Sequence, residues 1–303
     1  MTTYEVVGKP VTRQEGPDKV SGNFQYSADV TLPGMIWGKV LRSPYPHAKI
    51  VKIDASRALA MPGVHAVITG QDTLGMRIGR SVRDVPLLAE DEVRFVGEKI
   101  AAVAAGDPDL AEEALLMIDV EYEPLPAVFD PVEAMEPGAP LVHAGSPVFE
   151  SSSGPVQPQG NILNHSTWSS GDVEQGFSES DQIFEHTFST TWVHQGYMEP
   201  YSCVVDIDDA GRVQVWANNK VPYTLRKQLA DALGLSEDQI LVNPCGIGGD
   251  FGGKSPAMNV PLAYFLSRSS GRPVKMIMSY IEELVAGNPR HPSVITIKTG
   301  VMN

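Results

Sequence analysis

The residues with the clearest chemical signature lie between positions 240 and 255, where the chain reads ILVNPCGIGGDFGGKS. Five glycines surround one phenylalanine, Phe251. Because glycine has no side chain, such a segment can turn sharply and bring consecutive backbone amides against an anion. The stretch therefore predicts a loop that binds an anionic group through its backbone.

Two other interpretations of this loop stay open. Residues 248–255 fit the pattern G-x-x-x-x-G-K-S of a P-loop nucleotide-binding module. A P-loop, however, opens an α/β domain whose later strands supply an acidic Mg²⁺ ligand, and only one helix-like and one strand-like run follow Ser255. The segment can also be a glycine-rich turn without any ligand.

The elements that must position the loop are visible on either side of it. A strand-like run ends at Trp216, an amphipathic helix ends at Gly234, and a second strand leads into the glycines. Three other segments occur earlier in the chain: VGKPVTRQEGPDKVSGNFQYSADVTLPGMIWGKVLRSPYPHAKI, VRFVGEKIAAVAAGDPDLAEEALLMIDVEYEPLPAVFDPVEAM and HQGYMEPYSCVVDID. Together, and in this order, they resemble the N-terminal part of the molybdenum-binding large subunit of the xanthine dehydrogenase and aldehyde oxidase family, the molybdenum hydroxylases.

The resemblance implies a role for each residue of the loop. In the family, the backbone of the glycine-Phe-glycine loop lies next to the molybdopterin cofactor. The matching cofactor-binding positions in this chain are Gly249, Asp250, Phe251, Gly252 and Gly253.

Three positions depart from the family pattern. Asp250 replaces a glycine, and a carboxylate beside an anionic cofactor is unfavourable, so we expect it to point away or to accept hydrogen bonds from loop amides. Lys220, in WANNKVP, takes the place of a glutamine near the metal, and Ser255 takes the place of a substrate-contacting glutamate. The resemblance puts both in the substrate pocket. Lys220 near the metal would favour an anionic substrate, unless its side chain extends into solvent.

The resemblance also implies the chemistry and the partners. It implies hydroxylation of an aromatic heterocycle, an aldehyde or an aryl-CoA, with water as the oxygen source and with molybdopterin, including its dinucleotide forms, as the cofactor. The catalytic glutamate base is expected outside this chain. A second polypeptide would complete the molybdenum domain, separate subunits would carry 2Fe-2S clusters and FAD, and the whole would form a dimer of heteromers. A non-catalytic scaffold or cofactor-handling relative is the alternative.

Composition is consistent with such a subunit. The net charge of -14 argues against nucleic acid, which needs a basic face. Cys203 and Cys245 lack the spacing of a zinc or iron–sulfur site, so no metal ligands are predicted in the chain. No apolar run is long enough to span a membrane, and MTTYEVVGKP does not resemble an export signal, so a cytoplasmic location is expected.

The pattern of segments predicts an α+β fold. We expect an arm over residues 1–18, a hammerhead-like α+β domain over 19–135, a linker rich in Pro, Gly and Ser over 136–163, and the incomplete first part of the molybdopterin-binding domain over 164–303. A helix is predicted from Asp107 to Leu116, with Asp107 as its cap. The last residues, TIKTGVMN, read as an uncovered edge strand, as if the domain continued elsewhere.

Other polar residues are predicted to be structural. Glu282 and Glu283 are expected on a solvated helix face or in a salt bridge, and Lys254 is expected to anchor the loop by donating to carbonyl groups. The residues of HQGYMEP, which include His194, Met198 and Glu199, are expected where a strand meets a turn, and His291 in a loop.

Overall fold

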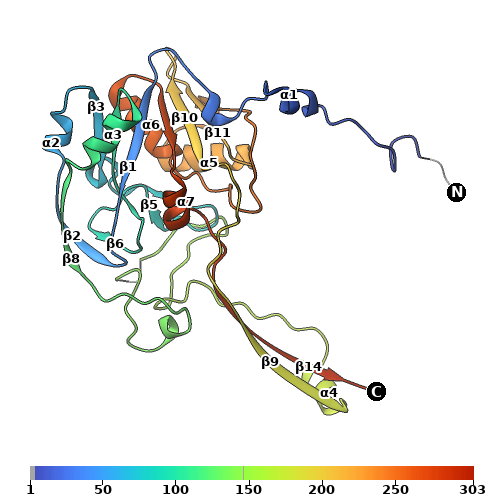
Figure 1. Cartoon of the computed structure of the whole chain (residues 1–303). Helices are drawn as coiled ribbons and strands as arrows, with labels where there is room; N and C mark the ends of the chain where they lie inside the picture. The colour runs from blue at the N-terminus through green and yellow to red at the C-terminus, as the bar shows by residue number, and fades with distance from the viewer. Residues whose placement is uncertain (1–3, 146) are drawn as a thin grey trace.

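The computed structural model describes residues 4–145 and 147–303. A seven-stranded mixed sheet forms the centre of the body (Figure 1). In spatial order its strands are β12 (Ile240–Asn243), β11 (Val213–Ala217), β10 (Ser202–Ile207), β13 (Val274–Ile277), β1 (Ile36–Arg42), β7 (Lys99–Ala105) and β3 (Val64–Thr69). The parallel pairing of β1 with β13 joins the two folded regions expected from the sequence into one sheet.

Helices cover both faces of this sheet, because its inner strands carry apolar side chains on both faces. Strand β7 is built from KIAAVAA and is buried at almost every position. Ala102 and Ala104 face the cluster that contains α6 (Val260–Ser270), whereas Ala101 and Val103 face the cluster of α3 (Pro108–Leu115). Because side chains alternate along a strand, small residues in succession allow both layers to pack closely.

Local sequence signals set the ends of the helices. The predicted helix after Asp107 is confirmed as α3, because the Asp107 carboxylate accepts a hydrogen bond from the Leu110 amide at 2.9 Å. The predicted end at Gly234 is also confirmed, since α5 (Pro222–Leu233) ends there with φ of 66°. The remaining helices are α1 (Gly16–Ser21), α2 (Ser56–Leu59), α4 (Val173–Ser178) and α7 (Tyr280–Ala286), with 3₁₀ turns at Ser27–Asp29, Gly70–Thr73, Glu133–Met135 and Glu237–Gln239.

Smaller sheets lie beside the body and beyond it. Strands β6 (Glu92–Val93), β2 (Ala48–Asp54) and β8 (Asp119–Pro124) form a three-stranded sheet, and β4 (Arg77–Ile78) pairs with β5 (Val85–Pro86). Strands β9 (Gln182–Thr190) and β14 (Ser293–Val301) form a two-stranded ribbon that projects away from the body (Figure 1).

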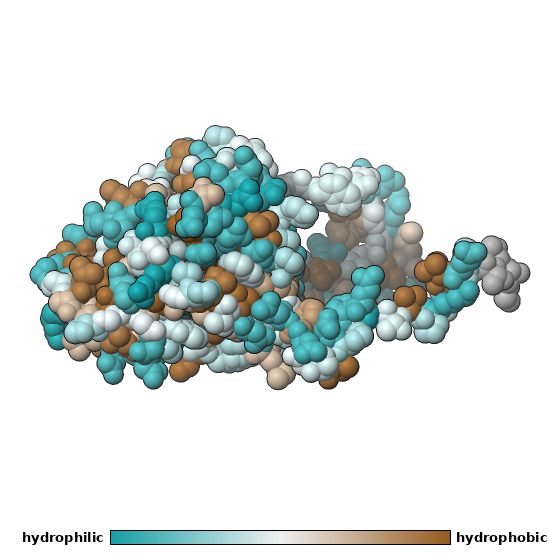
Figure 2. Space-filling model, turned by 90° about the horizontal axis from the view of Figure 1, so that it is seen from above, coloured by the Kyte–Doolittle hydropathy of each residue, from teal (hydrophilic) through white to brown (hydrophobic). Residues whose placement is uncertain are grey.

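Every residue of the ribbon is exposed, and one of its faces is apolar. The antiparallel register places Phe188 opposite Ile295 and His186 opposite Ile297, so these residues share a face with Phe184. Helix α4 packs against β14 on the side of Gly300, which is the other face. Brown, apolar residues are visible on the projecting segments as well as on the body (Figure 2).

The segment 136–163 contains only isolated bridges, such as Phe149 with Val156 and Gln159 with Ile162, within its described residues. The linker and the domain boundaries expected from the sequence stay predictions. None of the helices in 4–145 and 147–303 has the length and apolarity that a membrane crossing demands.

Candidate functional site

The glycine-rich loop follows β12 and has an unusual backbone. Gly249 and Gly252 have φ values of 99° and 101°, and Phe251 between them has φ of 43°. A left-handed conformation costs a non-glycine residue roughly 1–2 kcal/mol. The Phe251 side chain is 63% exposed, so burial of the ring does not compensate for this strain. Strain of this kind is typical of a backbone shaped for a ligand.

The Asp250 side chain organises the loop from within. Its carboxylate accepts hydrogen bonds from the Gly252 amide at 3.0 Å and from the Lys254 amide at 2.6 Å. Partial burial would raise the pKa of Asp250, but the hydrogen bonds from Lys220 and from these two amides lower it overall. The expectation that Asp250 bonds loop amides is confirmed.

Lys220 and Asp250, two of the departures from the family pattern, form an ion pair with each other. Lys220 Nζ lies 2.9 Å from Asp250 Oδ2, and the Lys220 amide donates to the Lys254 carbonyl at 3.0 Å. The lysine side chain therefore neither extends freely into solvent nor presents an uncompensated charge. Because Asp250 neutralises it, Lys220 alone gives no reason to favour an anionic substrate.

Three consecutive amides of the loop are left for a ligand. Within residues 4–145 and 147–303, no acceptor is hydrogen-bonded to the backbone N–H of Gly249, Asp250 or Phe251. The amides on either side are occupied, since the Gly248 amide donates to Glu199 at 2.7 Å and the Gly252 amide donates to Asp250. A run of free amides on an exposed loop is suited to an anion.

Lys254 supports the loop from behind, but not in the way we expected. It is fully buried, its Nζ lies 2.6 Å from Glu199 Oε2, and it sits 4.7 Å from the centre of the Tyr197 ring. The predicted donation to carbonyl groups is wrong, because a buried ammonium is stabilised best by a carboxylate. Glu199 thus holds both Lys254 and the Gly248 amide, which makes it structural, as expected.

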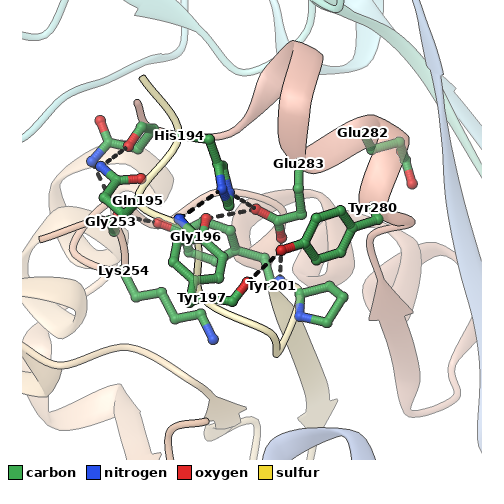
Figure 3. Close-up of polar contacts among 12 residues, drawn as sticks. His194, Gln195, Gly196, Tyr197, Tyr201, Gly253, Lys254, Tyr280, Glu282 and Glu283 are labelled. Carbon is green, nitrogen blue, oxygen red and sulfur yellow. Dashed lines mark hydrogen bonds and ion pairs between the residues drawn. The ribbon is translucent and has the colours of Figure 1, made fainter. Parts of the chain in front are cut away.

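A buried carboxylate, Glu283, is carried by α7 and points toward Tyr197 and Tyr201 (Figure 3). It accepts hydrogen bonds from the Tyr197 hydroxyl at 2.6 Å and from the Tyr201 amide, and His194 Nε2 lies 3.8 Å away. The expected solvated face is therefore wrong for Glu283, because α7 packs this side chain inward. Burial and the nearby carboxylate raise the pKa of Tyr197, so it remains a hydroxyl donor.

Glu282, next to Glu283, takes the expected salt bridge. It pairs with Arg42 at 2.8 Å, and it also caps α7 by accepting from the Ser279 amide at 2.8 Å. Figure 3 shows Glu282 pointing away from the tyrosines that Glu283 contacts.

The tyrosine cluster reaches the loop at Gly253. The Tyr201 hydroxyl and the Asn288 side-chain amide, the latter at 3.0 Å, both donate to the Gly253 carbonyl. A Cβ atom on Gly253 would lie 2.6 Å from Cε1 of Tyr197. The glycine is therefore required by close packing against the ring, and the rear of the loop is held rigidly.

Arg290 is a site residue that the sequence reasoning missed. Its Nη2 donates to the Phe251 carbonyl at 2.9 Å, and none of the described residues places a carboxylate within 4.0 Å of its guanidinium. Arg290 thus supplies an unpaired positive charge beside the free amides. The available signal was its position in NPRHP, between two prolines and next to His291, which lies in a loop as expected.

Ser255 is buried behind the loop, and its carbonyl accepts from the Asn219 side chain at 3.1 Å. A role for Ser255 in substrate binding stays a prediction. Cys203 is buried and Cys245 partly so, and burial raises their thiol pKa values to about 12 and about 11. Both are therefore protonated thiols at neutral pH.

Comparison with known proteins identifies the fold and the family. Residues 21–126 match the a/b hammerhead domain of aldehyde oxidase and xanthine dehydrogenase, and residues 156–303 match the molybdopterin cofactor-binding domain. The structure superposes on quinoline 2-oxidoreductase from Pseudomonas putida with a TM-score of 0.85 and 29% identity, over 97% of this chain and 37% of that chain.

Two curated relatives match almost the whole chain. A probable xanthine dehydrogenase subunit from Bacillus subtilis is 40% identical over 97% of this chain, which spans 38% of that relative's length. The nicotinate dehydrogenase large molybdopterin subunit from Eubacterium barkeri is 33% identical over 98% of this chain and 67% of its own length. The chain therefore belongs to the molybdenum-binding large subunits of the xanthine dehydrogenase and aldehyde oxidase family and corresponds to their N-terminal part.

Proposed function

We propose that the loop from Gly249 to Gly253 holds the molybdopterin cofactor of a molybdenum hydroxylase. The observation that carries this proposal is the run of three free amides at Gly249, Asp250 and Phe251. These groups fit an anionic cofactor, and the unpaired Arg290 beside them adds a positive charge. The cofactor, when bound, would supply oxidation of a substrate with water as the oxygen source.

The residues of this chain would position the cofactor rather than move protons. Asp250 fixes the curvature of the loop, and its pairing with Lys220 limits the repulsion of an anionic cofactor. Glu199 and Lys254 hold the loop from behind without exposing a charge. The catalytic base belongs, in this proposal, to the part of the relatives' length that the chain does not span.

The apolar face of the β9–β14 ribbon is where we place that missing part. Phe184, Phe188, Ile295 and Ile297 are each about half exposed there. The chain spans 38% of the length of the Bacillus subtilis relative. We propose that a second polypeptide packs on this face and completes the cofactor domain. Separate iron–sulfur and FAD subunits would carry electrons away from molybdenum.

Metal analysis combined with native mass spectrometry tests the proposal on the complex purified from its own host. We expect molybdenum near one per copy of the chain, together with a second polypeptide. An Arg290→Gln variant should lower the molybdenum content, whereas Arg212→Gln, which changes an exposed arginine on the turn between β10 and β11, should leave it unchanged. A metal-free complex would instead support a scaffold or cofactor-handling role.

The nucleotide-binding alternative conflicts with the geometry. The lysine of a P-loop must reach the phosphates of its ligand. Here Lys254 is fully buried and paired with Glu199, and the next helix, α6, begins only at Val260. We therefore expect no ATP or GTP binding by calorimetry.

A further inference from the structure

A cavity behind the loop has polar groups that the proposed function does not use. Its volume is about 420 Å³, and its walls come from β1, β7, the turn between β4 and β5, α5, the end of α7 and residues 256–259. Asn288, which also lines it, donates to the Gly253 carbonyl. The cavity therefore adjoins the loop at Gly253.

Unpartnered polar atoms are concentrated in this cavity. Across the described parts of the chain, eight buried side-chain N or O atoms have no hydrogen-bond partner, and three of them belong to lining residues: Arg42 Nη2, Gln228 Nε2 and Asn259 Oδ1. Gln228 and Asn259 are each only 7% exposed. Leaving a buried polar group unsatisfied costs about 1–3 kcal/mol, so three in one cavity indicate a polar ligand.

The charges that line the cavity are mainly positive. Arg42 and Lys99 both line it, and the nearest carboxylate partner of Arg42, Glu282, contacts Nε and leaves Nη2 free. Lys99 Nζ donates to the Met258 carbonyl at 3.2 Å and forms no ion pair with any described carboxylate. Arg80 and His291 also line the cavity, and Asp84 is the one acidic residue among the described residues of its lining.

Arg42 and Lys99 repel each other across this space. Burial, with the charge of Arg42 as the second cause, lowers the pKa of Lys99 to about 8, and the charge of Glu98 opposes the change. Two positive charges that share no counterion are stabilised by an anion between them. The rest of the wall is apolar, with Ile78, Val85, Phe95 and Met258.

We infer that this cavity binds a small organic carboxylate, with its carboxylate on Arg42, Lys99 and Gln228 and its apolar part against the remaining wall. Pockets of this size and mixed lining are typical for molecules of that class. Asn259 Oδ1 would accept a hydrogen bond from a hydroxyl or N–H of the ligand. The site does not depend on the cofactor, because none of the lining groups belongs to the loop from Gly249 to Gly253.

Isothermal titration calorimetry on the full chain, with any polypeptides that co-purify, tests the site. The probes are benzoate and benzamide, which differ in charge but hardly in shape. We expect benzoate to bind and benzamide to bind at least tenfold more weakly. Lys99→Met and Gln228→Leu should each weaken benzoate binding at least tenfold.

Lys275→Met is the matched control. Lys275 is also buried and also donates to a backbone carbonyl, that of Ala28 at 2.7 Å, but it does not line the cavity. Benzoate affinity should change less than twofold in this variant. Absence of benzoate binding to folded protein, equal affinity for benzamide, or wild-type affinity in Lys99→Met would overturn the inference. Molybdenum content is measured on the same samples, so failure of the cofactor proposal is seen separately.

Discussion

Replacing Lys254 by methionine is the sharpest test of how the loop is held. The change removes a fully buried ammonium whose Nζ lies 2.6 Å from Glu199 Oε2. At an effective dielectric of about 20, that separation corresponds to roughly 6 kcal/mol of Coulomb attraction before desolvation is subtracted. Removing one partner of a buried pair typically costs about 3–5 kcal/mol, because the other charge is left uncompensated. We expect Lys254→Met to lower the free energy of unfolding by that amount.

A double-mutant cycle with Glu199→Gln separates the pair from its surroundings. The single change at Glu199 leaves Lys254 buried without a counterion, so it should be similarly costly. The double variant leaves no unpaired charge, and we expect it to cost at least about 2 kcal/mol less than the sum of the two single variants. Urea denaturation at pH 7, followed by circular dichroism, measures all three.

Lys227→Met is the control for loss of a lysine as such. Lys227 pairs with Asp231 at 3.3 Å, and its side chain is 63% exposed, so its removal should cost less than about 0.5 kcal/mol. The reasoning is refuted if Lys254→Met costs less than about 1 kcal/mol, or if the effects of Lys254→Met and Glu199→Gln add.

Four further variants probe the loop and the cavity. Lys99→Met should stabilise the protein at pH 7 by up to about 3 kcal/mol, because folding lowers the pKa of Lys99 from 10.5 to about 8. The unfolded chain then binds the proton that the folded chain releases, so wild-type stability should rise relative to the variant between about pH 8 and 10.5. This would be contradicted if urea titrations at pH 7 and at pH 10 gave the same difference in free energy of unfolding between the wild type and Lys99→Met. Asp250→Ala should lower the free energy of unfolding by about 2 kcal/mol, because two loop amides lose their acceptor. Lys220→Ala, which removes only the ion pair, should lower it by at most about 1 kcal/mol. Equal losses of stability in thermal or urea unfolding would show that the ion pair, and not the bonding of the amides, stabilises the loop. Gly249→Ala should lower the free energy of unfolding by about 1–3 kcal/mol, because φ of Gly249 is 99° and the new Cβ would lie 3.0 Å from Cβ of Tyr197. An unchanged unfolding midpoint would argue against that backbone conformation.

The sequence by itself determined the local elements and the family. Capping by Asp107, the glycine that ends α5, and the glycine loop after β12 are short-range features, because each depends on residues within a few positions. The order of the four segments was enough to indicate the large subunit of a molybdenum hydroxylase, because it depends on no tertiary contact. The bonding of Asp250 to loop amides also followed from the sequence, since Asp commonly accepts such bonds in turns.

Only the tertiary structure decided which charges meet. Lys220 and Asp250 are 30 positions apart, and Lys254 and Glu199 are 55 positions apart, so their pairing depends on how β10, β11 and the loop come together. The burial of Glu283 depended on α7 packing its inner side against Tyr197 and Tyr201. The joining of both regions through β1 and β13 was also not predictable, because strand pairing between distant segments is set by the packing of the whole sheet and leaves no signal in either strand alone.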